Sequence, residues 1–217
     1  MRALLHPVAK PVVFALCLLP LAWLTWGAFA NTLGPNPAEH LIRATGDWTL
    51  RFLCTVLAVT PLRQLTGRPA LARFRRMLGL FCWFYGALHL LCYAWFDMGF
   101  EVADIAADIA KRPFILVGFL GLVLLTLLAA TSFNRAIRAL GARRWQALHR
   151  AVYAVAGLAL LHFFWMRAGK NDFGEVAVYA AILGTLLAWR VWRRFSPVSP
   201  AAATRRASAP ARPRARG

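Results

Sequence analysis

The chain contains the segment Phe114-Ile-Leu-Val-Gly-Phe-Leu-Gly-Leu-Val-Leu-Leu-Thr-Leu-Leu-Ala-Ala-Thr131, which has no charged side chain. A helix needs roughly 20 mostly apolar residues to cross a hydrocarbon core about 30 Å thick. Pro113 precedes the segment, and proline is favoured at the first position of a helix. The segment therefore predicts a transmembrane helix over about 113–131.

Apolar blocks of this kind recur along the 217 residues, of which 60% are apolar and 16% charged. Soluble domains are roughly half apolar and a quarter charged. The block after Trp48 is short and carries Arg51, whose charge can reach the membrane interface along its aliphatic stem. The sequence predicts an all-α integral membrane protein, a bundle of six transmembrane helices over about 11–30, 47–62, 77–96, 113–131, 147–166 and 174–192.

The charges divide into two sets along these six spans. One set of connecting segments, together with both termini, holds most of the 26 lysines and arginines and no acidic residue. The alternate set holds all eight aspartates and glutamates. The positive-inside rule places the basic set and both termini in the cytoplasm. The net charge of +18 is thereby explained by topology and anionic lipid headgroups, not by nucleic acid.

The segments outside the spans are short. Residues 1–10 are the expected cytoplasmic N-terminus, 11–195 the transmembrane domain, and 196–217 a disordered basic cytoplasmic tail rich in Ala, Pro, Ser and Arg. Ala28-Phe29-Ala30 also resembles a signal-peptidase site, so a cleaved first segment is the alternative to a retained helix. Between 97 and 112, acids at spacings of three and four predict a short amphipathic helix on the outer interface.

Two histidines, His89 and His162, fall in the outer halves of spans that run in the same direction. An ionisable group inside a span is costly and is by default a functional hypothesis. Two neutral imidazoles at one depth can supply both axial nitrogens to a haem iron, and Gly86 and Ala159 would leave room for the porphyrin edge. A pair of core histidines bonded to other helices is an equally weighted alternative. A divalent-metal site ranks lower, because carboxylates and paired cysteines are not nearby in the sequence.

His149 lies near the basic surface, and a helix would turn it roughly 140° away from the His162 face. At the same depth the third span has Arg75 and Arg76 in place of a histidine. His149 therefore indicates a second haem with an unusual partner, a quinone or flavin site, or an interfacial histidine beside Trp145. A transporter and a non-haem assembly subunit are the rival classes for the whole chain.

Several motifs, in order and spacing, resemble the MsrQ (YedZ) family of the ferric-reductase-like transmembrane group. The resemblance runs from about 38 to 194. It rests on Thr45-Gly-Asp-Trp-Thr-Leu-Arg-Phe-Leu53, Thr60-Pro-Leu-Arg63, Arg75-Arg-Met-Leu-Gly-Leu80, Ala87-Leu-His89 with Tyr93, Arg112-Pro113, and Trp145-Gln-Ala-Leu-His149 with Tyr153 and His162.

The resemblance implies a haem b electron-transfer subunit of the bacterial inner membrane. Such a subunit passes electrons from the quinone pool to a periplasmic molybdopterin-containing methionine sulfoxide reductase, which performs the catalysis. His89 and His162 would be the haem ligands, and His149 would serve a second haem or the uptake of electrons. FMN is a further implied cofactor. Arg75 and Arg76 would pair with its phosphate, or would instead belong to a quinone site. A ferric-reductase-like cytochrome b with another acceptor is the alternative.

The resemblance and the topology together predict a direction for the electrons. They enter from quinol near the inner face, around His149, and pass to the haem of His89 and His162 in the outer half. They leave to a soluble partner, and the acids of the outer segments suit a partner with a basic patch.

Overall fold

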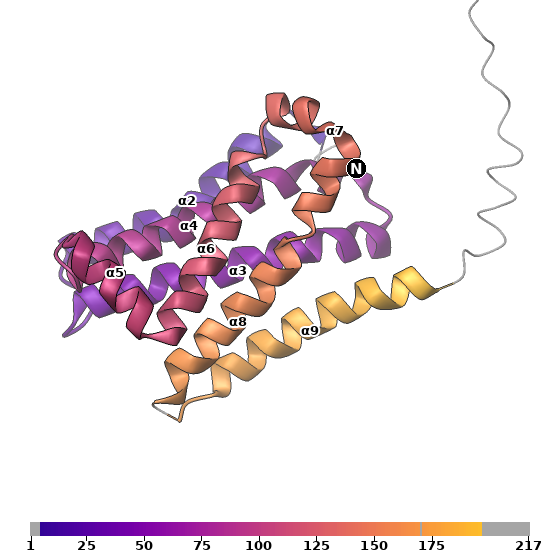
Figure 1. The fold of residues 1–217 in the computed structure, drawn as a ribbon. Coiled ribbons are helices and arrows are strands. Elements are labelled where there is room, and N and C mark those ends of the chain that lie inside the picture. Colours follow the sequence, from indigo (N-terminus) through magenta and orange to yellow (C-terminus); the bar gives the residue numbers. More distant parts are fainter. Residues whose placement is uncertain (1–4, 170, 197–217) are drawn as a thin grey trace, which may run out of the picture.

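The computed structural model describes residues 5–169 and 171–196, and within these ranges it contains helices and no strand. The prediction of an all-α protein is confirmed. Residues 1–4 and 197–217, including the predicted disordered tail, lie outside the described residues. The long helices are α2 (Ala9–Phe29), α3 (Pro37–Thr66), α4 (Arg75–Phe96), α6 (Pro113–Ala130), α8 (Val152–Ala168) and α9 (Gly174–Phe195), and the shorter ones are η1 (Pro69–Phe74), α5 (Val102–Lys111) and α7 (Asn134–His149) (Figure 1).

Five helical segments are long and apolar enough to cross a membrane: Ala9–Phe29, Pro69–Phe96, Pro113–Ala130, Asn134–Ala168 and Gly174–Phe195. Helix α3 is not among them, although its 30 residues span about 45 Å at 1.5 Å per residue. It carries Asp47 and Arg51 and packs along α4, η1 and α9, so much of its surface faces protein. The predicted count of six spans thus exceeds the five that composition supports.

Helix α3 begins at Pro37, well before the predicted start near 47. The Asn36 side chain accepts a hydrogen bond from the Glu39 amide at 3.1 Å, and Pro37 occupies the first turn, so the helix is capped where the chain leaves α2. Glu39 and Arg43 then form an ion pair one turn apart. The first turns of α3 are amphipathic and not apolar. A prediction based on runs of apolar residues therefore places the start of the helix too late.

Two connecting helices lie at opposite ends of the bundle, α5 at one end and α7 at the other (Figure 1). The predicted short helix between 97 and 112 is present as α5. Helix α7 was not predicted as a separate element; because it ends at His149, α8 begins at Val152 and not near 147. We call the α5 side, with connections 30–36, 97–112 and 169–173, the acidic end, and the α7 side, with connections 67–74 and 131–151, the basic end.

A buried tyrosine hydroxyl makes two hydrogen bonds to the backbone of α2 next to a proline. Pro20 lies inside α2, where proline lacks an amide hydrogen and its ring crowds the preceding turn. The hydroxyl of Tyr85, a fully buried residue of α4, donates to the Cys17 carbonyl at 2.9 Å and accepts from the Leu21 amide at 3.1 Å. A regular helix would join these two backbone groups directly. The phenol therefore bridges these two backbone groups and fastens α2 to α4.

Replacing Tyr85 with Phe should destabilise the protein by about 1–3 kcal/mol, because both α2 groups lose their partner in the protein interior. Thermal unfolding of the purified protein in detergent measures the loss. Tyr153→Phe is the comparison variant: Tyr153 is 37% exposed and its hydroxyl contacts the Arg190 side chain, so a smaller loss is expected there. Equal stability of Tyr85→Phe and wild type would contradict the bridging role.

Candidate functional site

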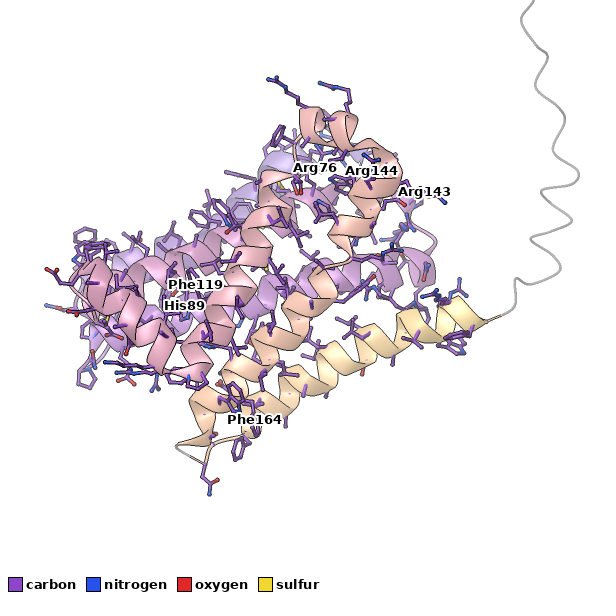
Figure 2. All side chains as sticks on the ribbon, in the orientation of Figure 1. Arg76, His89, Phe119, Arg143, Arg144 and Phe164 are labelled. Carbon is purple, nitrogen blue, oxygen red and sulfur yellow. The ribbon has the colours of Figure 1, made fainter. Side chains whose placement is uncertain are left out.

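The structure brings His89 of α4 and His162 of α8 together. Their ring centroids are 6.2 Å apart and the ring planes are inclined by 73°. Both side chains are partly buried, and Figure 2 shows His89 on the part of the bundle nearer α5. The sequence argument had placed the two histidines at one depth; the structure adds that their rings are neighbours.

Each of these rings makes the same kind of hydrogen bond. Nδ1 of His89 lies 2.8 Å from the Ile42 carbonyl of α3, and Nδ1 of His162 lies 2.6 Å from the Phe114 carbonyl of α6. A carbonyl oxygen can only accept, so Nδ1 is the donor and carries the proton in both rings. In a neutral imidazole the other nitrogen, Nε2, is then unprotonated. Both histidines are thereby held in the tautomer that offers Nε2 as a ligand.

A glycine lies against each ring, one helical turn after the carbonyl that the ring bonds. A Cβ added at Gly46 would come within 3.2 Å of Nδ1 and Cε1 of His89. A Cβ added at Gly118 would come within 2.7 Å of Nδ1 of His162, closer than real Cβ contacts. Two separate helices, α3 and α6, thus present the same arrangement of carbonyl and glycine to a histidine of the neighbouring helix.

The sequence analysis singled out Gly86 and Ala159 as room for a porphyrin edge and did not single out Gly46 and Gly118. A Cβ on Gly86 would meet Leu122 and Thr49, so Gly86 serves the packing of α4 against α3 and α6. Ala159 packs against the apolar core. The available signal for Gly46 and Gly118 was glycine inside a helix, where it costs stability unless a close approach requires it.

The distance between the rings fits a shared metal ion. Imidazole nitrogens bind metals at about 2 Å, and each ring centre lies about 1 Å further out, so two opposed ligands place ring centres about 6 Å apart. Among residues 5–169 and 171–196, no group of three or more His, Cys, Asp or Glu is placed to hold a metal ion. A porphyrin would supply four further nitrogens around an iron that is bound by two axial histidines.

His149 lies in a separate cluster at the basic end. Its Nε2 is 3.2 Å from the Thr131 hydroxyl, and its ring stacks on Trp145 with centroids 3.9 Å apart. The Trp145 indole donates to the Thr131 carbonyl at 2.8 Å. The cluster joins the end of α6 to the end of α7. Its contacts are those of the interfacial alternative, a histidine beside Trp145.

The two arginines predicted near His149 lie at the start of α4. The Arg76 guanidinium donates to the Asn134 side chain of α7 at 2.8 Å. Figure 2 shows Arg76 on the same part of the molecule as Arg143 and Arg144. Arg75 is the first residue of α4, next to Arg76. The basic end therefore gathers arginines from α4 and α7.

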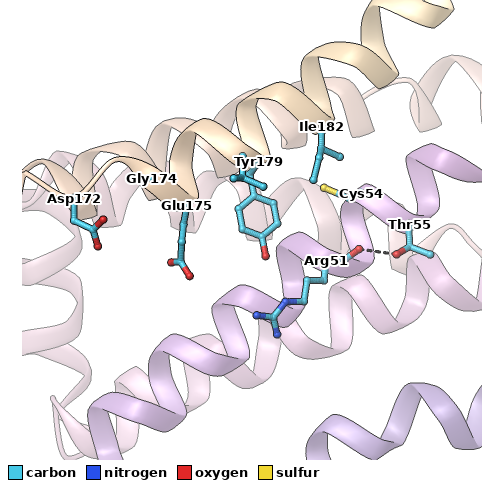
Figure 3. A pocket seen from close by; sticks show the side chains of 9 residues that line it. Arg51, Cys54, Thr55, Asp172, Gly174, Glu175, Tyr179 and Ile182 are labelled. Carbon is cyan, nitrogen blue, oxygen red and sulfur yellow. Dashed lines mark hydrogen bonds between the residues drawn. The ribbon is translucent and has the colours of Figure 1, made fainter.

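An open groove that the sequence did not predict lies between α3 and α9. Its volume is ≈ 690 Å³ (Figure 3). Arg51 lies over the Trp48 ring at 4.7 Å. Asp172 and Glu175 both pair with Arg167, at 3.0 Å and 2.5 Å. Most charged side chains of the groove therefore already have partners. The lining residues are Arg51, Cys54, Thr55, Asp172, Gly174, Glu175, Val178, Tyr179 and Ile182.

Comparison with known proteins defines the class of this membrane protein. Residues 44–160 match the family described as "Ferric reductase like transmembrane component", a range that includes His89 and His149 and ends before His162. The match covers more than half of the chain, so the protein is of the ferric-reductase-like transmembrane class. No solved structure matches the chain.

Curated relatives refine this assignment. The chain is 72% identical over 193 residues, 89% of its length and 88% of the relative, to the "Protein-methionine-sulfoxide reductase heme-binding subunit MsrQ" of Polaromonas naphthalenivorans. It is 52% identical over 188 residues to the protein of the same name from Bordetella pertussis, covering 85% of this chain and 91% of the relative. The protein of that name from Xanthomonas campestris is 45% identical over 194 residues, 87% and 88% of the two chains. The chain belongs to the MsrQ family, as its motifs predicted, and is a multi-pass bacterial membrane protein.

Proposed function

We propose that the chain is a haem b electron-transfer subunit in which Nε2 of His89 and Nε2 of His162 bind one haem iron. The observation that carries the proposal is the paired geometry: ring centroids 6.2 Å apart, with each Nδ1 committed to a backbone carbonyl. The relatives' names, which describe heme-binding subunits, support it.

The chain's own residues would prepare the ligands for this cofactor. The haem supplies one-electron exchange at its iron. The bonds to the Ile42 and Phe114 carbonyls fix the tautomer and orientation of the two imidazoles, a role that second-layer hydrogen bonds commonly play at metal sites. The Phe114 ring lies 6.1 Å from the His162 ring and adds an apolar wall.

The donor and acceptor proposed for this subunit follow from the family. The relatives are named as parts of a protein-methionine-sulfoxide reductase. The acceptor proposed here is a periplasmic molybdopterin-containing catalytic subunit of that system, and the donor is membrane quinol. We place quinol at the basic end, around His149, Arg75 and Arg76, with FMN as a further cofactor whose phosphate would pair with the arginines. The Nε2 bond of His149 to Thr131 favours electron uptake over a second haem there.

The topology proposed for the inner membrane has six spans, with α3 as the one that composition alone misses. Both termini are cytoplasmic, residues 11–195 form the transmembrane domain, and 1–10 and 196–217 flank it. The separation of acidic and basic connections to opposite ends of the bundle supports this orientation. The acidic end would then face the periplasm and dock a partner with a basic patch.

Fusions of alkaline phosphatase and green fluorescent protein test the orientation. A fusion after residue 196 should fluoresce and lack phosphatase activity, whereas one within 97–101 should show the reverse. Phosphatase activity at residue 196 would contradict the cytoplasmic C-terminus and the count of six spans.

Single substitutions His89→Ala and His162→Ala should each abolish the low-spin haem spectrum, because iron with two axial imidazoles needs both. The purified proteins are compared by reduced-minus-oxidised spectra and by a pyridine haemochrome assay per mole of chain. His40→Ala is the control, since His40 is exposed. A correctly inserted wild-type protein without haem would overturn the proposed function.

His149→Ala should slow quinol-driven haem reduction by about tenfold or more, which corresponds to about 1.4 kcal/mol or more in the barrier. The spectrum of the His89 and His162 haem should stay unchanged, because that pair lies in a separate cluster. Stopped-flow reduction by a soluble quinol analogue measures the rate, with His40→Ala again as control. An unchanged rate would remove His149 from the site of electron uptake.

A further inference from the structure

Thr45 is a buried polar side chain, with an exposed fraction of 1%. It lies on α3 directly before Gly46, the residue that lies against the His89 ring. Its hydroxyl oxygen is 2.7 Å from the Leu41 carbonyl and 2.9 Å from the Ile42 carbonyl. The second of these carbonyls is the one that the His89 Nδ1–H also bonds, at 2.8 Å.

Three donors lie within hydrogen-bonding distance of the Ile42 carbonyl: the helical amide one turn later, the His89 ring and the Thr45 hydroxyl, which shares its single proton with the closer Leu41 carbonyl. A carbonyl oxygen has two lone pairs, so these donors must share them. The Phe114 carbonyl has two such donors and not three: its helical amide and the His162 ring, whose Nδ1 lies at 2.6 Å.

We propose that Thr45 and Gly46 together form the seat of the His89 imidazole. Gly46 admits the ring against the α3 backbone, and Thr45 sets how strongly the Ile42 carbonyl binds the Nδ1 proton. Gly118 performs the first of these roles for His162, whose seat has no such hydroxyl at its acceptor. Thr45, Gly46 and Gly118 are positioning residues, since they act through the histidines, and the inference rests on the proposed role of both histidines as haem ligands.

The seat has an electronic consequence for the iron that the histidines would hold. A stronger bond from Nδ1–H to a carbonyl makes the imidazole a better electron donor through Nε2. A better donor stabilises the oxidised iron and lowers the midpoint potential of its one-electron couple. Competition from Thr45 weakens this bond at His89, so the native hydroxyl holds the potential higher than a seat without it would.

Replacing Thr45 with Val removes the hydroxyl and preserves the shape of the side chain. Redox titration of the purified haem protein should show a lower midpoint potential in Thr45→Val than in wild type. Thr45→Ser retains a hydroxyl and should keep the wild-type potential. An unchanged potential in Thr45→Val, or an equal shift in Thr45→Ser, overturns the role of the hydroxyl.

Glycine substitutions test the other half of the seat. Gly118→Ala and Gly46→Ala should change the low-spin electron paramagnetic resonance signal and lower haem occupancy, with the larger effect at Gly118, where the added Cβ lies 2.7 Å from the ring against 3.2 Å at Gly46. Gly157→Ala on α8 and Gly79→Ala on α4 are matched controls, because an added Cβ there meets nothing within 4 Å. Signals in Gly118→Ala and Gly46→Ala equal to these controls overturn the positioning role.

Different results would contradict the proposed haem site and the positioning roles of Thr45, Gly46 and Gly118. Absence of haem from wild type, or survival of its spectrum in His89→Ala and His162→Ala, removes the proposed function before any seat variant is compared. With haem present and both histidines required, only the potentials and resonance signals of the seat variants decide the inference. If Gly118→Ala does not fold, Gly46→Ala, which has the looser contact, carries the test.

Discussion

The hydrogen bond from a histidine Nδ1 to a backbone carbonyl of the neighbouring helix is the interaction on which the site depends. It occurs twice, from α4 to α3 and from α8 to α6. These are also the two most extensive helix–helix contacts in the described structure. The bundle can therefore be seen as two helix pairs, each with its own histidine, carbonyl and glycine. The site exists because the two pairs bring their histidine rings within 6.2 Å of each other, centroid to centroid.

The same constraint, that buried polar groups need partners, explains several other side chains. Tyr85 bonds the backbone of α2 beside Pro20, and Arg190 of α9 donates to the Leu57 carbonyl of α3 at 2.5 Å while lying over the Tyr153 ring. In a bilayer no water is available to satisfy such groups, so each must be met from within the protein. Polar side chains in this core therefore act mainly as connections between helices.

Part of this arrangement could be predicted from the sequence, and the reasons for the remainder are physical. Apolar length predicted most helices, and acidic periodicity predicted α5. Charge segregation predicted a common depth for His89 and His162, and the structure places their rings beside each other. The start of α3 was missed because Asn36 and Pro37 signal it by capping and not by hydrophobicity. Gly46 and Gly118 were missed because the need for glycine depends on which helix faces meet, and no spacing within one helix reveals that. The roles of His149, Arg75 and Arg76 stay predictions.

Helix α5 has a position that bears on the distance between the two histidines. The Tyr93 hydroxyl, one turn after His89, donates to Asp108 of α5 at 2.6 Å, and Asp108 pairs with Arg112 at 2.8 Å just before α6 begins. Helix α5 thus ties the end of one helix pair to the beginning of the other, and Arg76 bound to Asn134 does the same at the opposite end. Each carbonyl and glycine orients one ring within its pair, whereas these two links, together with the direct packing of α4 against α6, connect the pairs to each other. A protein that pressed on α5 would reach the histidine pair mechanically, through the spacing of the two halves.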